Sequence, residues 1–173
     1  MAVSLDFAHL TLQDALDLAI LVEDEAKERY DELVAQMETH HTADAAAFFR
    51  FMSVNEAKHG EELAARRKQL FGDAPRRVDR SMLWEVEAPG YENVHAFMTL
   101  REALTVALAA EVKAHWFFTD ALKLPMAAPV RELFAELQLE EIHHQELVSR
   151  EMAKLPPDES AAPEEFADEP VSQ

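Results

Sequence analysis

Apolar residues recur at alternating steps of three and four over four long stretches of the chain. This spacing places the apolar side chains on one face of a helix and indicates helices that bury that face. The first stretch shows it most clearly, with Ala19, Val22, Ala26, Tyr30 and Leu33 on one line. The pattern predicts helices over residues 11–39, 44–71, 99–122 and 129–155.

Capping residues support these boundaries. Thr11 is followed three positions later by Asp14, and Thr99 by Glu102, the spacing of a capping box at a helix start. Pro129 suits a first helical turn, where no backbone N–H is needed. Every other proline lies between or outside the predicted helices. The sequence therefore predicts an all-α protein.

The connections between the helices predict how they are arranged. Short loops join the first helix to the second and the third to the fourth, so each pair forms an antiparallel hairpin. Residues 72–98 between the hairpins, at ~3.3 Å per extended residue, are enough to run the length of a helix. Two hairpins joined by one long crossover are the topology of ferritin-like four-helix bundles. We expect this domain over residues 1–155, a short helix or strap at 81–86, and an acidic disordered tail at 156–173.

The two halves of the chain resemble each other. TLQDALDLAILVEDEAKERY, from Thr11, aligns without gaps with TLREALTVALAAEVKAHWFF, from Thr99. The second and fourth helices align in the same way, so that each carries Glu-x-x-His. Each half is therefore a helix with one glutamate on its apolar stripe, followed by a helix with a Glu-x-x-His pair. The repeat matches Glu23 with Glu111, Glu56 with Glu141 and His59 with His144.

These matched residues predict a metal site. Glu and His three residues apart lie on one helix face, about one turn from each other. Four carboxylates and two imidazoles that face one another in a bundle suit two hard divalent cations, iron among them. Without cations, the buried carboxylates would repel one another and lose their hydration at a cost of several kcal/mol each. The predicted ligands are Glu23, Glu56, His59, Glu111, Glu141 and His144.

Two details are open at this stage. The fourth helix also offers Glu140 with His143 at the same spacing, although the repeat favours Glu141 with His144. Tyr30, seven residues after Glu23, is either a residue of the apolar core or a catalytic residue beside the ligands that hydrogen-bonds a carboxylate or relays an electron.

Composition and charge restrict the classes of function. The chain has 34 acidic residues against 16 Lys and Arg, a formal charge of −18, which disfavours nucleic acid and anionic membranes as partners. It has no Cys, which excludes disulfides, thiolate metal sites and iron–sulfur clusters. The first residues lack the basic and apolar regions of a signal peptide. We therefore expect a cytoplasmic protein.

The order of these motifs resembles the ferritin-like superfamily, and rubrerythrin-like (erythrin) members in particular. The resemblance implies two iron ions in one bundle, cycling between Fe2+ and Fe3+, with other divalent metals as substitutes. This sequence differs from those of rubrerythrins proper in two ways. It has no Cys-rich rubredoxin domain, and it has Ala114 where rubrerythrins carry a further glutamate. The resulting set of four Glu and two His is similar to a bacterioferritin ferroxidase centre.

The function that the resemblance implies is that of a non-haem di-iron oxidoreductase, a peroxidase or ferroxidase that reacts with hydrogen peroxide or dioxygen. Its electrons would come from ferrous iron or from an external donor protein. The alternatives are iron binding, storage or delivery without turnover, and an oxygenase acting on an organic substrate. We also expect a homodimer or a higher homo-oligomer.

Overall fold

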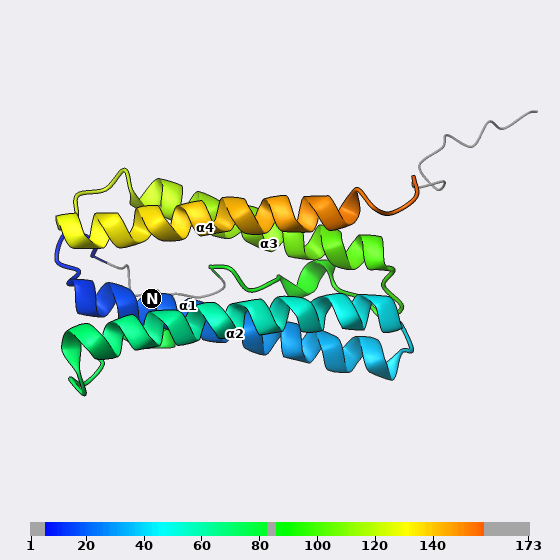
Figure 1. Cartoon of the computed structure of the whole chain (residues 1–173), viewed down its shortest axis with the longest axis horizontal. Helices are drawn as coiled ribbons and strands as arrows, with labels where there is room; N and C mark the ends of the chain where they lie inside the picture. The colour runs from blue at the N-terminus through cyan, green and yellow to red at the C-terminus, as the bar shows by residue number, and fades with distance from the viewer. Residues whose placement is uncertain (1–5, 83–85, 158–173) are drawn as a thin grey trace, which may run out of the picture.

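The computed structural model describes residues 6–82 and 86–157, which form four long helices and no strand (Figure 1). Two antiparallel hairpins, α1 with α2 and α3 with α4, form the bundle. The prediction of an all-α ferritin-like bundle is confirmed. None of the described helices has the length and apolar character needed to cross a membrane. The helices are α1 (Leu12–Thr39), α2 (Ala43–Phe71), α3 (Leu100–Ala121) and α4 (Ala128–Met152).

Both predicted capping boxes are present. The Thr11 hydroxyl accepts a hydrogen bond from the Asp14 N–H at 3.2 Å, and the Asp14 carboxylate accepts one from the Thr11 N–H at 3.2 Å. Thr99 and Glu102 make the same pair of bonds at 3.2 and 2.7 Å. Each pair satisfies two backbone groups that an open helix end would leave to solvent. The equivalent helices of the two halves therefore start in the same way.

The end of α4 differs from the prediction. The helix ends at Met152 instead of Leu155. Beyond it, the N–H groups of Lys154 and Leu155 each donate to the carbonyl three residues earlier, as in a 3₁₀ turn. Pro156 disfavours the α conformation at Leu155, the residue before it, so the helix cannot continue up to the proline.

Two apolar clusters fill the ends of the bundle. One contains Leu33, Met37, Phe49, Leu104 and Val148. The other contains Leu16, Ile20, Leu133, Phe134 and Phe118. Along every helix, the predicted metal ligands come between the residues of these two clusters. The centre of the bundle is therefore polar, and it is closed at both ends by apolar packing.

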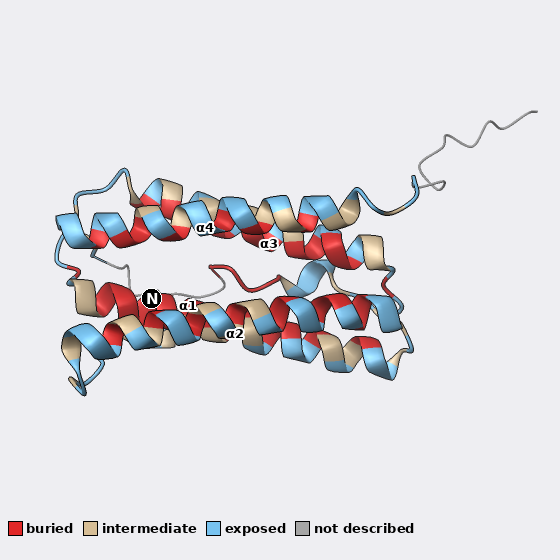
Figure 2. Ribbon diagram, in the orientation of Figure 1, coloured by how far each residue is buried: buried red, intermediate tan, exposed pale blue. Residues whose placement is uncertain are grey.

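The crossover enters the interior of the bundle. Two 3₁₀ turns, η1 (Arg80–Met82) and η2 (Tyr91–Asn93), lie in the crossover. From residue 86 onward the crossover lies between the two hairpins, and Val86, Glu87 and Ala88 are buried there (Figures 1 and 2). The helix or strap expected at 81–86 is thus a 3₁₀ turn at Ser81 and Met82, and residues 83–85 lie outside the described part. Most of the predicted tail, residues 158–173, also lies outside it.

Candidate metal centre

Each helix turns at least one glutamate into the polar centre. The exposed fractions of Glu23, Glu56, Glu111 and Glu141 are 5%, 0%, 0% and 3%. Buried glutamate is rare in proteins unless the carboxylate is paired. The apolar stripe explains the placement, because each glutamate occupies a core position of its helix between the two apolar clusters.

The ligand atoms of five residues lie close together. Glu56, His59 and His144 offer one ligand atom each, and these atoms lie within 4.8 Å of one another. The same limit holds for a second group, Glu56, Glu87, Glu111 and His144. Glu56 and His144 belong to both groups, so the groups describe neighbouring positions in one centre. The centre draws on both hairpins and on the crossover.

Two predicted ligands are outside these compact groups. Glu23 and Glu141 are buried beside them, and each still interacts electrostatically with Glu87 and Glu111. The structure therefore brings together the ligand atoms of four predicted ligands, Glu56, His59, Glu111 and His144. Glu23 and Glu141 lie close to the other carboxylates, but their ligand atoms belong to neither 4.8 Å group.

The two registers of α4 are distinguished by burial. Glu141 is 3% exposed and His144 is 9% exposed. Glu140 and His143 are both exposed. The pair favoured by the repeat is thus the pair that faces the centre.

Several carboxylates of the centre have oxygens that lack a hydrogen-bond partner. Among the residues that the structure describes, no hydrogen-bond partner exists for either oxygen of Glu56 or for one oxygen each of Glu23 and Glu141. Burial, followed by the negative charge of Glu87, raises the pKa of all three well above the usual value for glutamate. A cation would supply the partner that these oxygens lack.

The two histidines differ in their surroundings. Burial, followed by the positive charge of His144, lowers the pKa of His59. Burial also acts to lower the pKa of His144, but the hydrogen bond and negative charge of Glu111 outweigh it, and that pKa is raised. His144 Nδ1 lies 3.1 Å from Glu111 Oε2. This contact fixes the orientation of the imidazole.

Tyr30 contacts the same glutamate. Its hydroxyl donates to Glu111 Oε1 at 3.4 Å, a long hydrogen bond, and its side chain is fully buried. Burial, followed by the negative charge of Glu111, raises the Tyr30 pKa well above its usual value, so the phenol keeps its proton. Tyr30 therefore both belongs to the apolar core and hydrogen-bonds a predicted ligand.

Sequence reasoning missed Glu87. Its side chain is 1% exposed, and neither of its oxygens has a hydrogen-bond partner in the described part of the chain. Burial, followed by the negative charge of Glu111, raises its pKa to about 7. The residue lies in the crossover, which has no counterpart in the repeat. The one available signal was an acid between two apolar residues, Val86 and Ala88.

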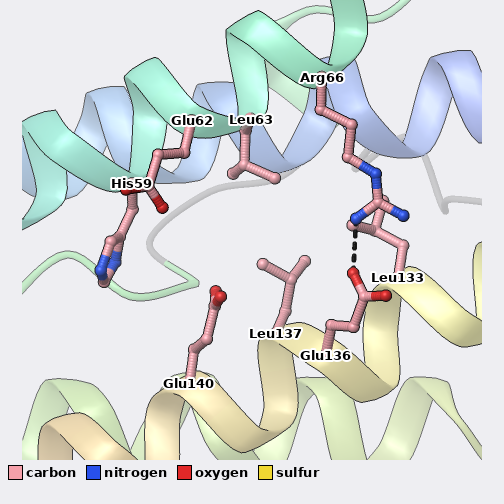
Figure 3. A pocket seen from close by; sticks show the side chains of 8 residues that line it. All are labelled: His59, Glu62, Leu63, Arg66, Leu133, Glu136, Leu137 and Glu140. Carbon is pink, nitrogen blue, oxygen red and sulfur yellow. Dashed lines mark hydrogen bonds and ion pairs between the residues drawn. The ribbon is translucent and has the colours of Figure 1, made fainter. Parts of the chain in front are cut away.

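A pocket of about 150 Å³ lies between α2 and α4, next to the centre. His59 and Glu140 stand at one end of it, and Arg66 forms an ion pair with Glu136 at the other (Figure 3). Leu63, Leu133 and Leu137 form the apolar part of the wall. The pocket thus brings solvent-accessible space to His59, one of the predicted ligands.

Comparisons with known proteins agree with this architecture. The Rubrerythrin family model matches residues 14–152. The crystal structure of a conserved protein from Magnetospirillum magnetotacticum MS-1 is similar to the chain, with 30% sequence identity and a TM-score of 0.63. The match covers 86% of this chain and 98% of that protein. A search of curated proteins found no match. The match to the family model, over most of the chain, shows that this protein belongs to the rubrerythrin family.

Proposed function

We propose that this protein is a non-haem di-iron oxidoreductase that reacts with hydrogen peroxide or dioxygen. The observation that carries the proposal is the buried set of carboxylates and imidazoles, which comes from both hairpins and includes oxygens of Glu23, Glu56 and Glu141 without a hydrogen-bond partner among the described residues. The family match supports a di-iron carboxylate centre. Oxygen ligands with two imidazoles suit iron, and the two compact groups share Glu56 and His144, so they belong to one centre.

Six residues would hold the two ions: Glu23, Glu56, His59, Glu111, Glu141 and His144. Iron bound there would supply reducing equivalents to the oxidant and open coordination positions. The electrons would be replaced by ferrous iron or by an external donor protein.

The chain orients these ligands through hydrogen bonds. Glu111 accepts from the Tyr30 hydroxyl and lies against His144 Nδ1, and its backbone carbonyl accepts from the Gln145 side chain at 3.2 Å. Such contacts around a metal fix the ligands and tune their basicity. The apolar clusters at both ends exclude water from the centre along the bundle axis. The pocket beside His59 provides an approach from the side for a small oxidant.

Anaerobic loading with Fe2+, followed by stopped-flow mixing with hydrogen peroxide or dioxygen, tests the proposal. We expect about two iron ions per chain and an absorbance change on mixing with at least one oxidant. The matched controls are Glu56→Gln, which we expect to abolish the change, and Glu61→Gln, an exposed residue of the same helix, which we expect to preserve it. Inertness toward both oxidants would overturn the proposal. Many ions per chain would instead indicate iron storage.

A further inference from the structure

The backbone on both sides of Glu87 is anchored to the two hairpins. The Arg29 guanidinium, on α1, donates to the carbonyl of Pro89. The Lys113 ammonium, on α3, donates to the carbonyl of Ala88 at 2.8 Å. Side chains of both hairpins thus hold the crossover at the residues that follow Glu87, which fixes where its side chain enters the bundle.

The anchored segment presents a buried carboxylate that meets the carboxylate of Glu56, and two carboxylates can bond only by sharing a proton or a cation. Glu87 is 1% exposed, and both of its oxygens lack a hydrogen-bond partner among the described residues. Val86 and Ala88 on either side of it are also buried, at 6% and 1% exposure. A side chain that served only to fill space here would be apolar, because burying an unpaired carboxylate is costly. The position therefore indicates a ligand of opposite charge.

Glu87 lies at a distance from its neighbours that suits a shared ion. One ligand atom each of Glu87, Glu56, Glu111 and His144 lie within 4.8 Å of one another. Oxygen and nitrogen atoms bound to one cation at about 2.0–2.2 Å lie at most roughly 4.4 Å apart, so a small contraction would complete the group. On α3 the next inward position after Glu111 is Ala114, which is fully buried and offers no ligand atom. The crossover supplies a carboxylate to this part of the centre, whereas α3 offers only that of Glu111.

We propose that Glu87 is a seventh protein ligand of the metal centre, supplied by the crossover. The inference rests on the proposed di-metal centre and adds to it a ligand that lies on no helix. A bound ion would then join the crossover directly to α2, α3 and α4, through Glu56, Glu111 and His144. Metal binding would consequently stabilise the crossover as well as the four helices.

The test uses the full chain, Co2+ as a spectroscopic probe and anaerobic Fe2+. The variant Glu87→Gln keeps the size of the side chain and removes its charge, and Glu92→Gln changes an exposed glutamate of the same crossover as a matched control. We expect Glu87→Gln to weaken binding of one of two ions at least roughly tenfold and to change the Co2+ visible spectrum. We expect Glu92→Gln to change neither.

Thermal unfolding without metal separates a ligand from a structural residue. Removing an unpaired buried charge should raise the unfolding midpoint of metal-free Glu87→Gln, while the increase that Co2+ produces becomes smaller. Metal should also protect the crossover of the wild-type protein from limited proteolysis more than that of the variant. If Glu87→Gln does not fold, Glu87→Asp, which keeps the charge and shortens the side chain by one methylene, still tests the loss of metal affinity and the change in the Co2+ spectrum.

Two outcomes would overturn the inference in different ways. If the wild-type protein binds no Co2+ or Fe2+, the proposed function and this inference both fail. If the wild-type protein binds two ions and Glu87→Gln binds them with unchanged affinity and spectrum, the inference fails while the proposed function stands.

Discussion

The imidazole rings of His59 and His144 stack face to face, with centroids 4.7 Å apart and ring planes 6° from parallel. One residue lies on α2 and the other on α4, so the stack joins the two hairpins at the centre of the bundle. It is costly for both rings to be in the positively charged, protonated form, because the two charges would repel each other at this distance. A neutral ring is also the form that binds a metal ion.

Stability of the metal-free protein should fall as pH rises. The pKa of Glu87 is raised from 4.5 to about 7 by burial and then by Glu111. A group with a raised folded-state pKa stabilises the fold fully below its unfolded pKa, and that stability is lost as pH rises through the folded pKa. The pKa values of Glu23, Glu56 and Glu141 are also raised, so these residues likewise make the fold less stable as pH rises. The pKa of His59 is lowered, so below about pH 6.5 this residue has the opposite effect on stability.

We therefore expect the unfolding midpoint in EDTA to decrease from about pH 5.5 to about pH 8. With Co2+ the trend should reverse, because metal binding requires deprotonated carboxylates. Scanning calorimetry at several pH values measures both curves. Parallel curves with and without Co2+ would contradict the prediction.

Replacing His144 should weaken metal binding, whereas replacing its neighbour should not. His144→Ala removes an imidazole that lies within 4.8 Å of three carboxylates. We expect at least roughly a tenfold loss of Co2+ affinity by calorimetric titration. His143→Ala is the matched control, since this residue is exposed on the same helix. A loss confined to the His143 variant would show that the other register of α4 binds the metal.

Tyr30→Phe should affect stability slightly and leave metal binding intact. The substitution removes only the hydroxyl that donates to Glu111 at 3.4 Å, and the repeat has Phe118 at the matching position. A hydrogen bond contributes about 0.5–1.5 kcal/mol net, and the length of this one places it at the lower end. Urea unfolding measures the loss, and metal titration should still give two ions. A fall to one ion would show that the contact with His144 alone does not hold Glu111 in its binding position.

Gly60→Ala should stabilise the protein. Gly60 lies within α2 opposite Glu23, and a Cβ at this position would be 3.5 Å from the Glu23 Cβ, an ordinary contact distance. Alanine in a helix interior is favoured over glycine by about 0.5–1 kcal/mol. Thermal unfolding should show a higher midpoint, with unchanged metal stoichiometry. A lower midpoint would show that α1 and α2 need the smaller residue in order to pack.

Asp17→Ala should destabilise the bundle strongly. The Asp17 carboxylate is fully buried and accepts two hydrogen bonds from Arg67, at 2.8 and 3.2 Å. Removing one partner of a buried pair costs about 3–5 kcal/mol, because the other charge stays buried. Glu28→Ala breaks an exposed pair with Arg80 and should cost at most about 1 kcal/mol. Equal losses for the two variants in urea unfolding would contradict this difference.

The helices and the inward residues were predictable because local rules determine them. Apolar periodicity gives the faces of the helices, the capping boxes at Thr11 and Thr99 give two starts, and the repeat distinguishes Glu141 from Glu140. The position of Glu87 was not predictable in this way. Its burial depends on how the crossover passes between the hairpins, and neither periodicity nor the repeat extends to that segment. Pro156 marks where α4 must stop, but the helix ends earlier, at Met152, because its last residues form a tighter turn that apolar periodicity does not reveal.

The separation of the two apolar clusters has a consequence for how the protein matures. Each end of the bundle buries its own hydrophobic surface without any contribution from an ion, and the repulsion among the acids is confined to a short middle section. Newly made chains could thus assemble before they acquire metal and hold an empty, proton-rich centre until ions arrive. The amount of metal-loaded protein would then depend on the supply of the ion as well as on synthesis of the polypeptide.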